Sequence, residues 1–254
     1  MPDTTGIPYT LHTFEPISLK EMDAVRLLDR VDVKYMFHRD LLQDILQQSA
    51  RDYRVLTIAG SGFSRYETRY FDTPDLEMYL QHHNGKLNRH KVRFRDYVDS
   101  GIRFFEVKLK TNKGRTIKDR VKQNSPAYRI EGDSELLLKE KTGYDPSMLV
   151  QSIQVNYKRI TLVRKDMTER LTLDFDLSFL FKNTNKHFPN LVIAEVKQDL
   201  AARSPFIATM QSRYIPAHSL SKYCLGIAVM NPGIKTNNFK SKLLHIQKMC
   251  HDNL

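Results

Sequence analysis

The sequence predicts an α+β fold: a closed antiparallel β-barrel of about eight strands with a charged lumen and with helices packed outside. Two observations lead to this expectation. Several segments alternate charged and apolar residues with a period of two, as strands with one buried face do. These segments also follow one another without the regular strand–helix alternation of a parallel sheet, which favours a barrel or a strongly curved sheet.

One domain is expected over residues 1–254, because no repeat, low-complexity tract or linker rich in proline and glycine divides the chain. At 254 residues, 41% of them hydrophobic, the chain can bury a substantial core. Strands are expected at residues 30–37, 53–59, 65–71, 91–98, 102–110, 115–121, 155–163, 170–179 and 191–197. Helices are expected at residues 18–28, where Ser18 and Glu21 have capping-box spacing, at 40–50, 76–82 and 136–141, and from 204 onward, ending in a basic helix at 239–249.

The charged faces of six of these strands contain the candidate site residues. A single strand with such a face is usually just solvated, but the repetition from strand to strand indicates a shared site. In a closed barrel these faces point into the lumen, while the apolar faces pack on helices. By period, the residues on the charged faces are Arg93 and Arg95; Glu106, Lys108 and Lys110; Lys118 and Arg120; Tyr157 and Arg159; Arg170, Thr172, Asp174 and Asp176; and Glu195 and Lys197.

The charge of the chain points to a polyanionic partner. The formal net charge is +11, from 40 Lys and Arg against 29 Asp and Glu. Residues 86–122 hold thirteen of the basic and only four of the acidic residues, so the excess is local to the strands just described. A lumen lined with like charges needs a counter-ion, which a chain of phosphates would supply. Glu106, Glu195, Asp174 and Asp176 are candidates to hold a Mn²⁺ or Mg²⁺ ion that bridges phosphate oxygens.

The remaining composition indicates a cytoplasmic protein. The two cysteines, Cys224 and Cys250, do not form a disulfide framework. The first residues lack the order of a signal peptide, and no apolar run approaches the roughly 20 residues that span a bilayer. We therefore expect no integral membrane segment, which leaves peripheral or partner-mediated contact with a membrane open.

The ordered motifs of the chain resemble the VTC domain, the polyphosphate-polymerase module of the triphosphate tunnel metalloenzyme superfamily. The resemblance runs over about residues 15–230, with a basic helix at about 235–254 outside it. The matching segments are RVDVKYMFH at 30–38, YETRYFDT at 66–73, KVRFRDY at 91–97, FEVKLKTNKGRTIKDRV at 105–121, NYKRI at 156–160, ERLTLDFDLSF at 169–179, IAEVKQD at 193–199 and SKYCLGI at 221–227.

The resemblance implies a role for individual residues. Those that would act on the transferred phosphoryl group and along the path of the product are Arg93, Arg95, Lys108, Arg159 and Arg170. Those that would bind phosphate are Lys34, Lys118, Tyr157, Ser221 and Lys222, joined by Arg120, which shares a face with Lys118. Glu195 would ligate the metal. Ser221 and Lys222 come from the resemblance alone.

The implied activity is transfer of the ATP γ-phosphoryl group to a growing polyphosphate, with Mn²⁺ or Mg²⁺ as cofactor. The hydrolytic members of the superfamily open with a Glu-x-Glu-x-Lys strand. Here the corresponding residues are Arg30, Asp32 and Lys34. One carboxylate instead of two fits a polymerase better than a hydrolase that activates water through a metal ion. The eukaryotic complexes also carry a regulatory domain and membrane helices, so the chain looks like a stand-alone, bacterial version.

Two other functions stay open from the sequence. The same tunnel could hydrolyse inorganic triphosphate or a nucleoside triphosphate. The chain could also be a module that binds polyphosphate or another polyanion without turnover. Nucleic acid is not the expected partner, because Phe94 and Phe105 fall on the apolar faces of their strands, whereas base stacking needs exposed rings.

Overall fold

A computed structural model describes residues 6–23, 30–124, 128–199 and 203–250. Its strands are β1 (Pro16–Ile17), β2 (Arg30–His38), β3 (Tyr53–Leu56), β4 (Phe63–Asp72), β5 (Arg89–Tyr97), β6 (Ile102–Lys110), β7 (Thr116–Gln123), β8 (Val150–Arg164), β9 (Glu169–Phe181), β10 (Thr184–Phe188) and β11 (Leu191–Asp199). Its α-helices are α1 (Gly6–Leu11), α2 (Leu19–Asp23), α3 (Leu42–Ser49), α4 (Glu77–His83), α5 (Asp133–Thr142), α6 (Pro205–Ser212), α7 (Lys222–Met230) and α8 (Lys240–Cys250). Short 3₁₀ turns are η1 (Arg39–Leu41), η2 (Val98–Ser100), η3 (Pro146–Met148) and η4 (Asn237–Phe239).

All nine strands predicted from the sequence are present, with ends that differ by a few residues. Two short strands, β1 and β10, were not predicted. The capping box before α2 is confirmed, because the Glu21 carboxylate accepts from the Ser18 amide at 2.9 Å and the Glu21 amide donates to the Ser18 hydroxyl at 3.3 Å. The second half of the helix expected at 18–28 lies outside the described residues. None of the described helices is both long and apolar enough to cross a membrane.

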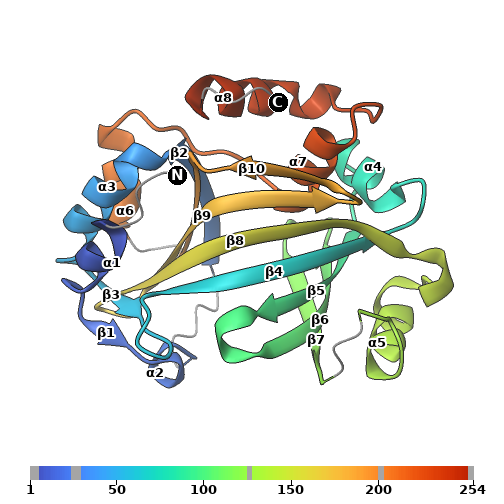
Figure 1. Cartoon of the computed structure of the whole chain (residues 1–254), viewed down its shortest axis with the longest axis horizontal. Coiled ribbons are helices and arrows are strands. Elements are labelled where there is room, and N and C mark those ends of the chain that lie inside the picture. The colour runs from blue at the N-terminus through green and yellow to red at the C-terminus, as the bar shows by residue number, and fades with distance from the viewer. Residues whose placement is uncertain (1–5, 24–29, 125–127, 200–202, 251–254) are drawn as a thin grey trace.

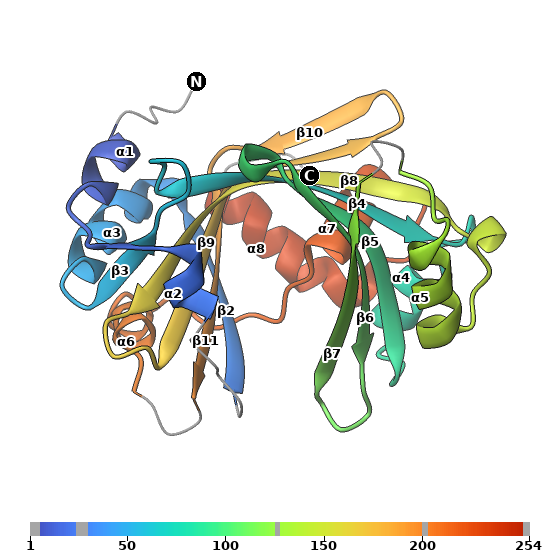
Figure 2. The same ribbon diagram turned by 90° about the horizontal axis from the view of Figure 1, so that it is seen from below.

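The sheet is strongly curved and, apart from the parallel pair β1 and β3, antiparallel, but hydrogen bonds among the described residues do not close it. Its main path runs β2-β11-β9-β8-β4-β5-β6-β7, and within the described residues β2 and β7 are its two ends. Figure 2 shows the resulting arch: β9, β11 and β2 form one leg, β5, β6 and β7 form the other, and β4 and β8 run across the top. The α+β class and the antiparallel sheet are therefore confirmed, whereas closure into a complete barrel is not. We call the concave face of this sheet, which carries Lys34, Arg93, Arg159 and Glu195, the trough.

The outer face of the sheet is apolar and is covered by helices on both legs. On one leg Phe37, Leu173 and Val196 pack against α1, α3 and α6. On the other leg Phe94 and Phe105, whose relative exposures are 1% and 0%, pack against α4 and α5. These helices lie on either side of the molecule in Figure 1. Burial of Phe94 and Phe105 confirms the face to which the sequence pattern assigned them.

Helices α7 and α8 lie on the inner side of the sheet, contrary to the prediction that all helices pack outside. The inner faces of the strands change character along their length. Lys34, Glu195 and Arg159 give way to Met36, Ile193 and Val155 on the same faces, and these apolar residues form one core with α7 and α8. The two helices thus cover the apolar end of the trough and lie between the legs in Figure 2.

Close packing and a buried carboxylate hold α7 in place. A Cβ atom at Gly226 would lie 2.6 Å from side-chain atoms of Ile153 and Phe179, so only glycine allows this approach to the sheet. At the start of the helix the Tyr223 hydroxyl donates to the carboxylate of Asp72, which is fully buried and also accepts the Met78 amide at the start of α4. These contacts fix the N-terminus of α7 beside the charged part of the trough.

Candidate functional site

The sequence-predicted site residues gather in the trough. Those on the sheet come from β2, β5, β6, β7, β8, β9 and β11, and the cross-strand register brings their charged faces to one side. The N-terminus of α7 adds two more. The residues placed on this side are Lys34, Arg93, Arg95, Lys108, Lys118, Arg120, Tyr157, Arg159, Arg170, Glu195, Ser221 and Lys222. Lys118 and Arg120 lie on the exposed edge strand β7, at the rim of the trough.

Glu106 holds together the basic residues of the β5–β7 leg. Its side chain is fully buried, and its Oε2 atom lies 2.7 Å from Nε of Arg93, while its Oε1 atom lies 3.0 Å from Nζ of Lys118. Burial alone would raise the pKa of this carboxyl, but Arg93, Arg95, Lys118 and Lys108 together outweigh burial and hold the pKa well below its usual range. Glu106 is therefore an ionised counter-charge with both oxygens occupied.

Asp174 plays the same part on β9. Arg159 binds it through two parallel contacts, Nε to Oδ1 at 2.5 Å and Nη2 to Oδ2 at 2.7 Å, and the Lys222 ammonium also donates to Oδ2. Burial works to raise the pKa of Asp174, but Arg159 and then Lys222 lower it overall. The pairing ties α7 to the sheet and fixes the Arg159 guanidinium in the trough.

Glu195 is the least enclosed of the three carboxylates. Its side chain is 22% exposed and lies 3.3 Å from the ammonium groups of both Lys34 and Lys197. Lys197 also lies 2.9 Å from Oδ2 of Asp32. Burial would raise the pKa of Glu195, but Lys197 and Lys34 hold it well below its usual range. Glu195 is therefore ionised and partly open to the trough.

Several cations of the trough have no carboxylate partner among the described residues. Arg95 is only 9% exposed, and its one hydrogen bond to a described residue is from Nε to the Thr68 hydroxyl at 3.4 Å. Lys108 makes no hydrogen bond or ion pair to a described residue, and the Arg93 guanidinium, burial and then Arg95 lower its pKa well below the usual range. A buried positive charge without a counter-charge is energetically costly, so these side chains are suited to bind an anion.

A stack of tyrosines forms the apolar wall beside these cations. The rings of Tyr66 and Tyr157 stack at 5.1 Å and 8°, and the Arg159 guanidinium lies 5.0 Å from the Tyr66 ring centre. The Tyr157 hydroxyl is buried and has no hydrogen-bond partner in the described structure, and the same is true of the Thr172 hydroxyl. These two hydroxyls are free to hydrogen-bond to a phosphate ligand in the trough.

Sequence reasoning missed two residues that the structure places among the predicted ones, Lys91 and Tyr70. Lys91 precedes Arg93 by two positions and shares its face of β5, so its parity could have revealed it. Lys197 was placed on its charged face by the sequence pattern, which did not indicate that it bridges Asp32 and Glu195. Tyr70 accepts a hydrogen bond from Nη1 of Arg93 at 3.1 Å, which no sequence signal indicated.

Three of the four candidate metal ligands are closely paired with basic side chains in the structure. Asp176 has a positive φ of 56°, and this irregularity turns its side chain away from the trough, toward Lys158 at 2.8 Å and His187 at 2.7 Å. Glu106 does point into the trough, but Arg93 and Lys118 occupy its oxygens. Asp174 is similarly engaged by Arg159 and Lys222.

Glu195 remains the carboxylate that could bind a metal. No group of three or more His, Cys, Asp or Glu side chains suited to a metal occurs in the described part of the chain. One exposed carboxylate still fits Mg²⁺ or Mn²⁺, since such ions are commonly held by one or two carboxylates together with substrate phosphates. A metal at Glu195 would therefore need the phosphate oxygens of the ligand to complete its coordination.

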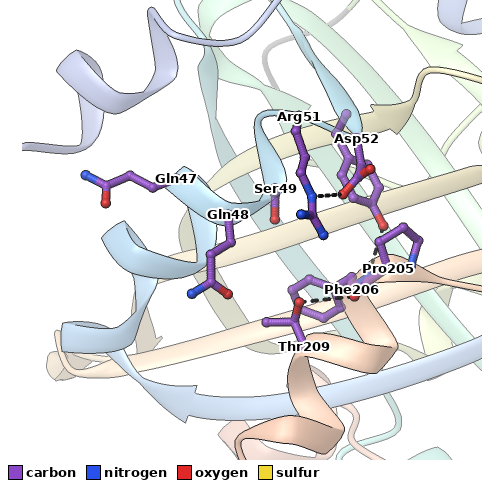
Figure 3. Close-up of a pocket in the computed structure, with 9 residues that line it drawn as sticks. Gln47, Gln48, Ser49, Arg51, Asp52, Pro205, Phe206 and Thr209 are labelled. Carbon is purple, nitrogen blue, oxygen red and sulfur yellow. Dashed lines mark hydrogen bonds and ion pairs between the residues drawn. The ribbon is translucent and has the colours of Figure 1, made fainter.

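A separate surface pocket lies outside the trough, between α3 and α6 (Figure 3). Its volume is about 280 Å³, and its lining includes Gln48, Tyr53 and Thr209. Arg51 is the only lining cation among the described residues and is paired with Asp52 at 2.9 Å. The pocket therefore lacks the uncompensated positive charge of the trough and contains none of the predicted site residues.

The family model of the VTC domain matches residues 29–231, which include every charged group of the trough described above. The chain belongs to the VTC domain family. It is thereby a member of the triphosphate tunnel proteins, as the sequence motifs predicted. No curated protein sequence matches this VTC domain significantly.

Solved structures resemble this VTC domain at low sequence identity. A putative adenylate cyclase from Bacillus halodurans is 13% identical, with a TM-score of 0.52 over 76% of this chain and 94% of that one. A putative adenylyl cyclase from Hippeastrum, described as having a dominant triphosphatase activity, is 10% identical, with a TM-score of 0.46 over 78% of this chain and 96% of that one. At these identities the likeness concerns the fold alone.

Proposed function

We propose that this VTC domain is a polyphosphate polymerase, which transfers the γ-phosphoryl group of ATP to the end of a growing polyphosphate chain and releases ADP. Membership of the family and the uncompensated cations Arg95 and Lys108 support a phosphate chain as the ligand. We further propose that the protein is cytoplasmic, as its composition indicates, and that ATP and polyphosphate are its partners.

The arrangement suits phosphoryl transfer without a strong general base. A terminal phosphate oxygen is already anionic at neutral pH, so it can attack directly once it is aligned with the γ-phosphorus atom. Arg93, Arg95 and Arg159 would neutralise the charge of the transferring group, with Lys108 and Arg170 on the path of the product. The further phosphate-binding residues would be Lys34, Lys118, Arg120, Tyr157, Ser221 and Lys222. A Mn²⁺ or Mg²⁺ ion held by Glu195 would supply additional charge neutralisation at the phosphate oxygens.

The state of Asp32 is the observation that favours a polymerase over a hydrolase. Hydrolytic members of the superfamily have two glutamates on the opening strand, whereas this strand offers only Asp32. That carboxylate lies 2.9 Å from the Lys197 ammonium. With one carboxylate in place of two, the strand is less suited to hold a second metal ion that could activate water.

Product analysis tests this proposal. With ATP and Mn²⁺, we expect long phosphate chains on a stained gel and ADP in excess of free phosphate. Release of free phosphate equal to ADP, without chains, would show a triphosphatase. Tight binding of polyphosphate without turnover of any triphosphate would show a binding module.

Substitution of Glu195 tests the metal site. Glu195→Gln should remain folded but lose metal-dependent turnover, because the amide no longer offers an anionic ligand. The matched control is Glu135→Gln, which makes the same change at an exposed carboxylate of α5 and should retain activity. Turnover should be measured over a Mn²⁺ titration, and wild-type rates with an unchanged Mn²⁺ dependence in Glu195→Gln would refute the metal assignment.

A further inference from the structure

Two lysines face each other across β5 and β6 in the trough. The register pairs Lys91 directly with Lys108, and both side chains are partly buried. Like charges opposite each other on neighbouring strands repel, and neither ammonium has a carboxylate partner among the described residues. This pair therefore concentrates positive charge that the protein itself does not balance.

The pair lies beside the N-terminus of α7. The Lys91 ammonium donates to the Ser221 hydroxyl at 2.9 Å, and the same hydroxyl accepts the Cys224 amide at 3.4 Å as the N-cap of the helix. Beyond this point the inner face of the sheet is apolar and covered by α7 and α8. A phosphate chain lying along the charged part of the trough must end where the helix begins.

The groups around both lysines make their protonation sensitive to an anion. Burial lowers the pKa of Lys91, and its other neighbours are Cys224 of α7, Tyr70 of β4, Arg89 of its own strand, Lys34 of β2 and His82 of α4. The pKa of Lys108 is lowered by Arg93, burial and Arg95, while the nearby carboxylates of Glu106 and Glu195 act to raise it. A phosphate group between the lysines would raise both pKa values, so its binding should take up protons.

We propose that Lys91, Lys108 and Ser221 form a subsite for the terminal phosphoryl group of a phosphate chain, with Lys91 as an additional binding residue. Two ammonium groups match a terminal phosphate, which carries a second negative charge near neutral pH. An internal phosphate carries only one. The subsite rests on the proposed function, since it presupposes that the trough binds phosphate chains.

A comparison of linear and cyclic triphosphate distinguishes this subsite from nonspecific attraction of an anion to the basic trough. Cyclic trimetaphosphate has no terminal phosphoryl group, so it cannot use the subsite. We expect Lys91→Gln to weaken calorimetric binding of linear triphosphate about tenfold or more, and binding of the cyclic compound by less than about threefold. The control Lys165→Gln removes the same charge at an exposed turn and should change neither affinity. Thermal denaturation of each variant checks that it is folded.

Proton uptake gives a second readout. In alkaline solution, where the terminal phosphate is fully ionised, binding of linear triphosphate to the wild type should take up protons, measured from the heats in buffers of different ionisation enthalpy, and should weaken as the pH rises further. Binding of linear triphosphate to Lys91→Gln should take up fewer protons. Equal losses for the linear and cyclic compounds, or unchanged proton uptake, would overturn the subsite while leaving the trough as the binding face. A wild-type protein that binds neither compound would instead refute the proposed function.

Discussion

Replacing Glu106 with glutamine should lower the free energy of unfolding by about 3–5 kcal/mol, because it leaves Arg93 and Lys118 without their shared buried counter-charge. Chemical denaturation at neutral pH measures this loss. Glu135→Gln, at the exposed ion pair with Lys139, is the matched control and should change stability by less than about 1 kcal/mol. Inorganic triphosphate should restore part of the loss by supplying the missing negative charge.

The pH dependence of the Glu106 effect has a defined sign. The pKa of Glu106 is lowered in the folded protein, so its contribution is fully present above the unfolded value of about 4.5 and disappears as the pH falls toward the folded value. The difference between wild type and Glu106→Gln should therefore be constant near neutral pH and shrink below about 4.5. A variant as stable as the wild type at pH 7 would show that Glu106 does not hold this leg together.

Replacing Arg95 with methionine should have the opposite effect: little change in stability and a large loss of activity. Methionine fills similar space without charge, and Arg95 has no carboxylate partner among the described residues, so stability should change by no more than about 1 kcal/mol. Phosphoryl transfer from ATP should fall about 100-fold or more, because a preorganised positive charge is lost where negative charge must be held. Steady-state rates and unfolding curves of the same preparation provide both measurements.

The control for Arg95→Met is Arg51→Met, which removes an exposed guanidinium from the pocket between α3 and α6. It should retain wild-type rates. Activity within twofold of the wild type in Arg95→Met would mean that this guanidinium does not contact the reacting phosphates. A loss of stability as large as that of Glu106→Gln would mean that Arg95 is structural.

The period-two pattern predicted the strands and the sidedness of the site because alternation along an extended chain is local and regular. It failed at Asp176, whose positive φ changes which alternate residues of β9 face the trough. No pattern in the sequence marks that irregularity. It also omitted Lys91, although the residue has the same parity as Arg93.

The arrangement of whole elements was harder to predict than the faces of single strands. Closure of the sheet depends on whether β2 and β7 approach each other, which side-chain alternation does not encode. The inner position of α7 and α8 did have a signal: Met36, Val155 and Ile193 continue the charged faces with apolar residues. Such residues need a cover, and two helices rich in apolar side chains follow β11 in the sequence.

The most direct test of the central claim is a crystal structure of the protein with a non-hydrolysable ATP analogue and Mn²⁺. We predict that the triphosphate lies in the trough, within hydrogen-bonding distance of Arg95 and Lys108, with Mn²⁺ between Glu195 and phosphate oxygens. A triphosphate bound on the outer face, or in the pocket between α3 and α6, with the trough cations left uncontacted, would contradict the account.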